Sequence, residues 1–259
     1  MTSLNAIIIA AGRGSRLEHY TDDCPKCMVS VAGRSILDHQ LASLGHHGIT
    51  EIDVIRGYLS EKLVVDGATY HENHDWQDNN ILHSLFCAES AMDGGFLSTY
   101  SDIVYTPKVV EAGLKQPGDI TLVVDRKWRQ AYVDRSDHPV TQAELVCVDG
   151  ERVTSVGKHV GPEDAVGEFI GLAVHSSRGA QLMRTVFAEL REEFDDDAPF
   201  RRERPFRRAY LADLYEEMIE RGIDIHWSPI DGGWREIDTV EDLHAVNDVW
   251  SAPAPAGSS

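Results

Sequence analysis

The sequence lacks several features that would indicate other classes of protein. It has no apolar run near the roughly 18 residues that a membrane-spanning helix requires, and no hydrophobic N-terminal signal. It also has few cysteines, namely Cys24, Cys27, Cys87 and Cys147. These absences favour a soluble protein in the reducing cytoplasm, with no membrane partner. Cys24 and Cys27 form a C-x-x-C pair, but no second Cys/His pair follows at zinc-finger spacing, which disfavours a structural zinc site.

Positive charge is scarce as well. Lys and Arg number 24 against 43 Asp and Glu, giving a formal net charge of −19 with histidine neutral. This balance disfavours nucleic acid as a partner, because nucleic acids are polyanions. An acidic protein that handles phosphates must supply positive charge locally or as a metal ion. The chain of 259 residues, 42% hydrophobic, is long enough for one large core or two small ones, and we expect one.

Strand-like and helix-like segments alternate through the first half. Residues 5–10 read as a buried strand, because IIIA lacks alternation and a glycine-rich turn follows. Further strands are predicted at 51–56, 68–71, 95–100 and 120–124, and helices at 36–47, after Gly57-Tyr58, at 79–92 and at 107–115. This order predicts an α/β fold with a Rossmann-like, mostly parallel mixed sheet flanked by helices, whose ligands gather at the carboxyl ends of the strands.

The second half has a different character. Residues 128–139 are polar and irregular, and three short segments read as strands that pair antiparallel. Those strands are predicted at 143–148, 152–156 and 169–175, followed by helices at 177–194 and 206–221, a strand at 224–228 and a closing helix at 240–250. The last residues, 251–259, read SAPAPAGSS, which predicts a disordered tail.

A glycine-rich turn with basic residues follows the first strand. Residues 10–17 read A-A-G-R-G-S-R-L and include Arg13 and Arg16, and Lys26 follows ten residues later. Backbone N–H groups and positive charge at one place suit a polyphosphate. The turn is not a dinucleotide fingerprint, because Leu17 stands where G-x-G-x-x-G needs its third glycine, and it lacks the G-K-[ST] of a P-loop.

With Pro25-Lys26 downstream, this turn resembles the signature L-A-A-G-x-G-[ST]-R-[LM]…P-K of the nucleotidyltransferase superfamily, which activates sugar phosphates and alcohol phosphates. Gly57-Tyr58 is similar to the family's "GY", and residues 167–171 are similar to its "E-[FY]-x-G" strand. Residues 234–243 are similar to its C-terminal W-x-[ED]-[IV]-[DN]-T-x-[ED]-D-[LY]. Separated matches in the right order make coincidence an unsatisfactory explanation.

Within the superfamily, three stretches most resemble the small bacterial cytidylyltransferases that act on phosphocholine or 2-aminoethylphosphonate. They are P-K-C-M at 25–28, N-N-I with S-L between 79 and 85, and S-D-I-V-Y at 101–105. The resemblance implies a magnesium-dependent enzyme that joins CMP from CTP to a small phosphorylated amino-alcohol or alkylphosphonate and releases pyrophosphate. It implies one domain over residues 1–250, with a nucleotide-binding part to about 125 and an acceptor-binding part over about 126–235.

The resemblance also assigns roles to the phosphate-handling residues. Lys26, Arg16 and Arg13 would be the catalytic cations, and Asp102 and Asp238 would hold Mg²⁺ as hard oxygen ligands. No general base is needed, because a phosphate with a second pKa near ~6 arrives largely as the dianion. The expected nucleotide-binding residues are Ala10, Ala11, Gly12, Gly14, Ser15, Asn79, Asn80 and Ser84. A helix N-cap at Asn79 is an alternative or additional role.

Aromatic and acidic residues of the second half form the expected acceptor site. Aromatic faces with carboxylates suit a quaternary ammonium or an amine, although aromatic residues more often belong to the core. Among the aromatic residues, we expect Trp128 in particular to form a wall of such a cage. Lys158 would hold the acceptor phosphate or stay a solvated hairpin lysine. The expected acceptor-binding residues are Trp128, Tyr132, Lys158, Glu168, Tyr210, Asp213, Trp234 and Glu236.

Two other functions remain open. One is a sugar-1-phosphate nucleotidylyltransferase that uses UTP, GTP or dTTP, and the other is a non-catalytic nucleotide-sensing domain. Intact Lys26, Asp102 and Asp238 count against the sensor. The arginine cluster 201–208 would pair with the acidic run 195–197, contact the partner in a homodimer, or close over the acceptor.

Overall fold

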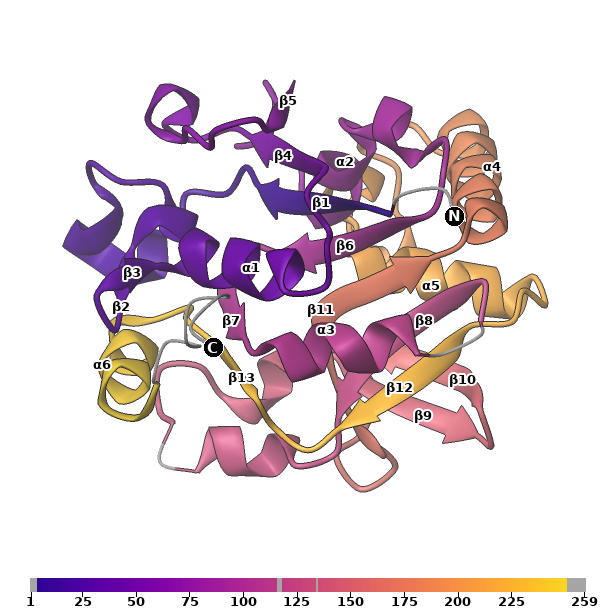
Figure 1. The fold of residues 1–259 in the computed structure, drawn as a ribbon. Coiled ribbons are helices and arrows are strands. Elements are labelled where there is room, and N and C mark those ends of the chain that lie inside the picture. Colours follow the sequence, from indigo (N-terminus) through magenta and orange to yellow (C-terminus); the bar gives the residue numbers. More distant parts are fainter. Residues whose placement is uncertain (1–3, 116–117, 134, 251–259) are drawn as a thin grey trace.

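One mixed sheet forms the centre of the structure. The computed structural model describes residues 4–115, 118–133 and 135–250 (Figure 1). Within those ranges nine strands hydrogen-bond in the order β5-β4-β1-β6-β11-β8-β12-β10-β9. They are β1 (Asn5–Ala10), β4 (Ile52–Arg56), β5 (Thr69–Glu72), β6 (Phe96–Tyr100), β8 (Ile120–Asp125), β9 (Leu145–Asp149), β10 (Arg152–Gly157), β11 (Gly167–His175) and β12 (His226–Ile230).

The strand directions separate two halves of the sheet. β1 pairs parallel with β4 and β6, and β4 pairs parallel with β5. β11 then runs antiparallel to β6 and β8, whereas β12 is parallel to β8. β9 and β10 form an antiparallel ribbon at the far edge. The predicted α/β class is confirmed, with a parallel first half and a small antiparallel addition.

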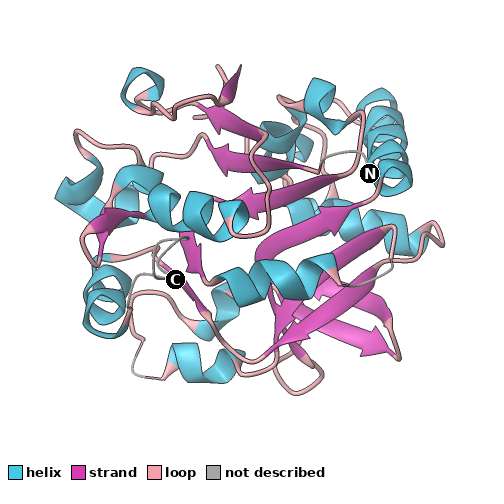
Figure 2. Ribbon diagram, in the orientation of Figure 1, coloured by secondary structure: helices cyan, strands magenta, loops and turns pink. Residues whose placement is uncertain are grey.

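Helices cover both faces of this sheet (Figure 2). On one face, residues of α1 and α3 belong to the apolar cluster that contains Ala6 and Ile8, and on the other, residues of α2, α4 and α5 belong to the cluster that contains Ile7 and Ile9. β1 is therefore apolar on both sides, which explains its unbroken hydrophobic run. The helices are α1 (Ile36–Gly45), α2 (Ile81–Phe86), α3 (Pro107–Leu114), α4 (Ser177–Glu193), α5 (Leu211–Glu220) and α6 (Val240–Val249).

Two short ribbons lie outside the main sheet. β2 (Ser30–Val31) pairs with β3 (Arg34–Ser35), and β7 (Ile103–Tyr105) pairs antiparallel with β13 (Trp234–Glu236). Beyond the β7–β13 ladder, the backbone N–H of Ile237 donates to the carbonyl oxygen of Asp102 at 2.8 Å. This pairing brings Asp102 next to Asp238, although 136 positions separate them in the chain.

Most predicted elements occur within a few residues of their expected bounds, and the differences have local causes. The predicted helix 79–92 is α2 followed by the 3₁₀ turn Glu89–Met92. α2 begins at Ile81 because Asn80 rather than Asn79 caps it, by accepting from the N–H of Ile81. The predicted helix 206–221 begins as the 3₁₀ turn Phe206–Arg208, and the segment after Tyr58 forms only the 3₁₀ turn Ser60–Lys62.

Two other expectations concern the ends and the organisation of the chain. The predicted disordered tail, 251–259, lies outside the described residues. The single domain over residues 1–250 stays a prediction. None of the helices in the described ranges combines the length and the apolar composition that crossing a bilayer demands.

Candidate active site

Two adjoining cavities lie where β1 and β6 end. The first, the turn cavity, is lined by the glycine-rich turn together with Lys26 and Trp76 and has a volume of about 310 Å³. The second, the glutamate cavity, is lined by Glu144, Glu168 and Glu236 and has a volume of about 210 Å³. The residues that line both are Arg16, Asn80, Ile81, Tyr100, Asp102 and Asp238. Ligands in the two cavities would therefore meet at the two aspartates.

Lys26 bridges those two aspartates. Its Nζ donates to Asp102 Oδ2 and to Asp238 Oδ1, both at 2.8 Å, and its side chain is only 9% exposed. Gly14 makes room for this side chain, because a Cβ on Gly14 would lie 2.7 Å from Lys26 Cδ. Gly14 also has a φ of +67°, which glycine adopts readily. The glycine of the turn thus allows the lysine to reach the aspartates.

The electrostatics keep this group charged. Burial alone would lower the pKa of the Lys26 ammonium, but the carboxylates of Asp102 and Asp238 outweigh burial and raise that pKa. Burial opposes ionisation of Asp238 too, yet Lys26, His138 and Arg16 hold the pKa of its carboxyl well below the usual range. Lys26 is therefore a cation and Asp238 an anion throughout the neutral pH range.

Asp102 and Asp238 fit a divalent cation. The Oδ1 atom of Asp102 is buried and has no hydrogen-bond partner among the described residues. A buried carboxylate oxygen without a partner is costly, and a hard cation such as Mg²⁺ satisfies it. The donor chemistry of the two aspartates is therefore compatible with the magnesium that the sequence implied.

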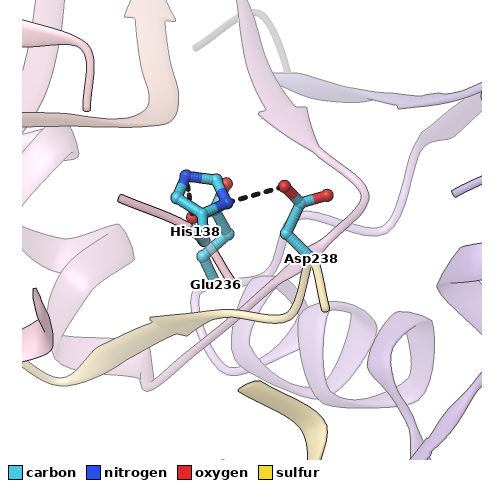
Figure 3. A group of neighbouring side chains, drawn as sticks. All are labelled: His138, Glu236 and Asp238. Atoms are coloured by element: carbon cyan, nitrogen blue, oxygen red, sulfur yellow. Dashed lines mark hydrogen bonds and ion pairs between the residues drawn. The ribbon is translucent and has the colours of Figure 1, made fainter. Parts of the chain in front are cut away.

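A histidine from the irregular segment before β9 also contacts Asp238. The Nδ1–H of His138 donates to Asp238 Oδ2 at 2.8 Å, and its Nε2 lies 3.5 Å from Glu236 Oε2 (Figure 3). One ligand atom from each of these three side chains lies within 4.8 Å of the others. The irregular segment before β9 and the C-terminal motif thus meet at the Asp238 carboxylate.

The glutamate cavity concentrates buried carboxyl groups. Glu168, 5% exposed, accepts a hydrogen bond from Tyr132 Oη at 2.6 Å, and Glu144 accepts one from Tyr100 Oη at 3.1 Å. Burial raises the pKa of Glu168 to about 8 and that of Glu144 to about 7. Burial and the Asp102 charge raise the pKa of Glu236 as well. These carboxyls would ionise more readily beside a ligand cation.

Aromatic rings and one lysine complete this cavity. The indole N–H of Trp234 donates to the buried Asp125 at 2.8 Å, which fixes the ring as a wall. The Nζ of Lys158 lies 4.5 Å from the centroid of the Tyr210 ring and donates to Gln142 Oε1 at 3.0 Å. Beyond the residues that it shares with the turn cavity, the glutamate cavity is therefore lined by three glutamates, by Lys158 and by the rings of Tyr210 and Trp234, among other residues.

Tyr100 forms part of the wall between the two cavities, and Gly171 makes its position possible. A Cβ on Gly171 would lie 2.3 Å from Tyr100 Cδ2. Gly171 has a φ of +80° and lies where the register of β11 against β8 shifts between Phe169 and Ala173. The glycine of the "E-[FY]-x-G" stretch thus gives the tyrosine its space, while Glu168 of the same stretch faces the glutamate cavity.

The structure brings most of the predicted site residues together. Those that line the turn cavity are Ala11, Gly12, Gly14, Ser15, Arg16, Lys26, Asn79, Asn80, Ser84, Asp102 and Asp238. Those that line the glutamate cavity include Lys158, Glu168, Tyr210, Trp234 and Glu236. The two asparagine amides are already engaged, since Asn79 exchanges two hydrogen bonds with Asn73 and Asn80 donates to the carbonyl oxygen of Arg208. The individual roles stay predictions.

The prediction that Trp128 forms a cage wall is wrong. Its ring is 1% exposed and packs in a small apolar cluster with Ala143, Leu145 and Val160. Tyr132 packs edge-on against Trp128 and reaches the glutamate cavity only through its hydrogen bond to Glu168. Neither ring is among the described residues that line the two cavities. Trp128 therefore packs against Tyr132, and Tyr132 in turn holds Glu168, which lines the glutamate cavity.

Three other predicted site residues also point elsewhere. The Ala10 side chain belongs to the apolar core on the α1 face. Arg13 is half exposed, 3.7 Å from Asp22, and is not a cavity wall within the described ranges. Asp213 is buried in ion pairs and accepts a hydrogen bond from the N–H of Tyr210 at the start of α5. Asp213 therefore contacts the glutamate cavity through its neighbour Tyr210, which lines that cavity.

The arginine cluster 201–208 is mostly paired with α5 rather than with the acidic run. Arg201 binds Glu217 and Glu220, whereas Arg207 is the member that pairs with Asp197. Arg208 makes a different contact, because its guanidinium donates to the carbonyl oxygens of Gln77 at 2.8 Å and Asn79 at 3.2 Å. Arg208 thereby ties a loop of the turn cavity to the segment that carries Tyr210.

Sequence reasoning missed several cavity residues. They are Trp76, Tyr100, His138, Gln142 and Glu144. Tyr100 ends a predicted strand directly before the S-D pair, so its position at a strand end was available as a signal. Glu144 lies inside the strand predicted at 143–148, which gives no such signal. His138 and Gln142 lie in irregular backbone, where no periodicity indicates which side chain faces inward.

Comparison with known proteins gives one family. The profile of the MobA-like NTP transferase domain matches residues 6–157. The CTP:phosphoglutamine cytidylyltransferase of Campylobacter jejuni is 31% identical over 252 residues, which cover 93% of this chain and 98% of that protein.

Two solved structures are similar in fold over nearly the whole chain. The CTP:phosphocholine cytidylyltransferase from Streptococcus pneumoniae gives a TM-score of 0.72 at 20% identity, covering 95% of this chain and 99% of its own. The inositol-1-phosphate CTP transferase from T. maritima gives 0.71 at 20% identity, covering 96% and 98%.

Proposed function

The chain belongs to the family of MobA-like NTP transferase domains and is a nucleotidyltransferase, and from this we propose that it transfers CMP from CTP to a small phosphorylated acceptor that carries an ammonium group. Pyrophosphate is the other product and Mg²⁺ the cofactor. The family resemblance inferred from the sequence is confirmed, and the alternative of a non-catalytic nucleotide sensor is wrong.

The observation that carries the proposal is the meeting of two cavities at Lys26, Asp102 and Asp238. Nucleotidyl transfer is a displacement at the α-phosphorus by an acceptor oxygen, in which the protein mainly positions reactants and neutralises charge. The α-phosphate of a nucleotide in the turn cavity and the phosphate of an acceptor in the glutamate cavity would then both lie next to Lys26, Asp102 and Asp238.

The chain's own residues then have distinct tasks. Lys26 and Arg16 neutralise the α-phosphate and the leaving pyrophosphate, with the turn around Gly12 to Ser15 beside them. Asp102 and Asp238 would hold Mg²⁺, which when bound adds positive charge between the two phosphates. The acceptor phosphate or phosphonate attacks as a dianion, so no side chain has to remove a proton.

The preference for CTP is supported by the names of the relatives, which include a CTP:phosphoglutamine cytidylyltransferase. In the turn cavity, Trp76 offers an aromatic face to a nucleobase, and Asn79 lies beside it. To bind the base, the Asn79 side-chain amide would have to replace a hydrogen bond to Asn73 with one to the base.

The ammonium group of the acceptor is supported by the glutamate cavity. Glu144, Glu168 and Glu236 face it with Tyr210 and Trp234, a set that suits a small cation in contact with aromatic faces. Binding an ammonium would stabilise the ionised form of these buried carboxyls and so compensate their desolvation. Phosphocholine, aminoalkylphosphonates and phosphoglutamine all carry such a group, whereas a hexose 1-phosphate does not.

The test is a matrix of nucleotides and acceptors. Pyrophosphate release is measured with CTP, UTP, GTP and dTTP, each against phosphocholine, 2-aminoethylphosphonate, phosphoglutamine, a hydroxyalkylphosphonate and glucose 1-phosphate, with Mg²⁺ present. We expect the highest rates for CTP with an ammonium-bearing acceptor. Faster turnover of glucose 1-phosphate with any nucleotide would overturn the proposal in favour of the sugar-phosphate alternative, and no release from any pair would overturn it too.

A further inference from the structure

We propose that His138 is a positioning residue that holds the carboxylate of Asp238 for metal binding while Lys26 and Arg16 engage phosphate. The inference rests on the proposed function, because it takes Asp238 as a metal ligand. It concerns the segment Arg135–His138, here called the strap, which connects the acceptor side of the molecule to the C-terminal motif.

The strap is fastened by acidic residues of that motif. Arg135 donates from Nε to Asp242 Oδ1 at 2.6 Å and from a terminal nitrogen to Asp242 Oδ2 at 2.8 Å, and it also binds Glu236. The backbone N–H groups of Ser136 and Asp137 both donate to Glu241 Oε2, at 2.9 and 3.0 Å. The Arg135 side chain is 8% exposed, so this is a buried, bidentate pair of the stronger kind.

The fastened strap leaves little freedom at its end, where His138 stands. The ring is buried, its Nδ1–H donates to Asp238 Oδ2, and its other nitrogen faces Glu236 (Figure 3). Asp238 is fixed from the other side by its backbone N–H, which donates to Asp242 Oδ2 at 3.0 Å. Asp242 therefore holds both the strap and the backbone of the aspartate that the strap contacts.

Three side chains hold the Asp238 carboxylate in this structure, and they differ in what else they face. Lys26 and Arg16 line the turn cavity, where they would bind the phosphates in the proposed reaction, and Arg16 also lines the glutamate cavity. His138 lines the glutamate cavity and is absent from the described lining of the turn cavity. When Lys26 and Arg16 bind phosphate instead, the His138 imidazole still orients the Asp238 carboxylate through its hydrogen bond.

Hydrogen bonds to metal-binding carboxylates have a measurable effect. Partners of this kind orient the ligand, and their loss typically costs about 10- to 100-fold in metal affinity or activity. His138→Ala should weaken metal binding by that factor. Asparagine places an amide N–H near the position of Nδ1, whereas glutamine places one near Nε2, so His138→Asn should restore binding and His138→Gln should not.

The experiment measures Mn²⁺ binding by electron paramagnetic resonance, with Mn²⁺ alone and with Mn²⁺ plus CTP, for the wild type and the three variants. His244→Ala is the matched control, because His244 is exposed on α6 and its Nε2 lies 3.5 Å from the hydroxyl oxygen of Tyr20, away from both cavities. Thermal unfolding shows whether each variant is folded. If His138→Ala does not fold, the Asn and Gln variants decide the question.

The expected result is binding about 10- to 100-fold weaker for His138→Ala and His138→Gln, near-normal binding for His138→Asn, and no change for His244→Ala. In pyrophosphate release, the Mg²⁺ concentration for half-maximal rate should rise by the same factor while kcat at saturating Mg²⁺ changes less. Wild-type binding by His138→Ala, equal binding by the Asn and Gln variants, or no Mn²⁺ binding by the wild type would each overturn the inference. Failure of every acceptor pair with normal Mn²⁺ results would instead overturn the proposed function.

Discussion

The two cavities differ in the charged side chains that each adds to the shared Arg16, Asp102 and Asp238. The turn cavity adds the cation Lys26 beside a glycine-rich turn, whereas the glutamate cavity adds Lys158 and three glutamates, Glu144, Glu168 and Glu236, around a small volume. The first suits a polyanion and the second suits a cation. A molecule with phosphate at one end and ammonium at the other would therefore enter in one orientation, with its phosphate toward the nucleotide.

The cavities also differ in how they are built. The turn cavity draws on a few stretches, chiefly the turn after β1 and the residues around α2. The glutamate cavity draws on side chains from β6, the segment before β9, the loop after β10, β11, the start of α5 and β13. Changes at the elements that line the glutamate cavity alone, such as β11 and β13, should alter acceptor binding without altering nucleotide binding, and the following variants test this separation.

The largest effect is expected at Lys26, which lines the turn cavity and binds the two aspartates that line both cavities. Lys26→Ala removes the cation between Asp102 and Asp238 and leaves the two carboxylates without the ammonium that they share. We expect kcat to fall by about 10²- to 10³-fold, the loss typical of one transition-state donor. Initial rates of pyrophosphate release at saturating CTP and acceptor measure it. A rate within tenfold of wild type would remove Lys26 from the chemistry.

Trp128 should matter for stability rather than for specificity. Trp128→Ala empties a buried site in the cluster with Ala143, Leu145 and Val160, which should lower the free energy of unfolding by about 3–5 kcal/mol. Urea unfolding measures the loss, with Trp128→Phe as the milder control. The Km values for CTP and acceptor should change by similar factors. A selective rise in the acceptor Km with normal stability would restore Trp128 to the acceptor site.

Glu168 tests the charge of the glutamate cavity. Glu168→Gln keeps the shape but removes the negative charge, so the acceptor Km should rise about 10- to 100-fold, as for a lost charged hydrogen bond, while the Km for CTP stays unchanged. Steady-state kinetics in both substrates measure this, and Glu163→Gln on an exposed loop is the control. An equal rise in both Km values would contradict the separation of the cavities.

The same residue predicts a pH dependence. The pKa of Glu168 is raised to about 8 by burial, so the folded protein binds a proton more tightly than the unfolded chain does. Its contribution to stability is full below about pH 4.5, the ordinary glutamate range, and is lost as the pH rises through about 8. Without acceptor, the melting temperature should therefore fall across this window, and less so in Glu168→Gln. The acceptor Km should fall as the carboxyl ionises.

Arg208 tests the connection between the cavities. Arg208→Ala removes the hydrogen bonds to the carbonyl oxygens of Gln77 and Asn79, so the loop of the turn cavity and the segment of Tyr210 lose a tie. We expect both Km values to rise a few fold, a coupling of about 0.5–2 kcal/mol. Arg207→Ala, whose partner is the exposed Asp197, is the control. A change confined to one substrate would show that the tie does not couple the sites.

The smallest effect is expected at Arg13. It is half exposed and 3.7 Å from Asp22, a surface contact of little energetic value. Arg13→Ala should leave kcat and both Km values within about twofold of wild type. Arg16→Ala is the contrasting variant, because Arg16 contacts Asp238 and lines both cavities. A large loss for Arg13→Ala would mean that the turn rearranges when nucleotide binds.

The sequence predicted the turn cavity better than the glutamate cavity for a physical reason. Gly14, Arg16 and Lys26 lie within 13 positions, and their roles follow from local backbone chemistry. Trp128 was misjudged because its burial depends on Ala143, Leu145 and Val160, which arrive from later segments. A single sequence does not show which distant side chains will cover an aromatic ring.

The helices and strands were likewise predicted best where the signals that determine their ends lie close by in the sequence. β1 and α1 were predicted within two residues at either end, since the hydrophobic run and the Ser35 capping box are local signals. α2 begins two residues later than predicted, because Asn79 is engaged by Asn73 and the backbone N–H of Asn80 donates to the carbonyl oxygen of Arg207 from the other half of the chain. Glu144 and His138 likewise acquire their neighbours only through tertiary pairing.

The close approach of Tyr100 to Gly171 has a consequence for how this enzyme can change over evolutionary time. Any base substitution that replaces the glycine introduces a side-chain atom where the tyrosine ring already lies, 2.3 Å from Cδ2. A substitution at Gly171 is therefore a poor way to change substrate preference, because it would displace Tyr100, which lines both cavities. New acceptor preferences must instead arise on the outer walls, at residues such as Lys158 and Tyr210, where a replacement leaves the nucleotide side intact.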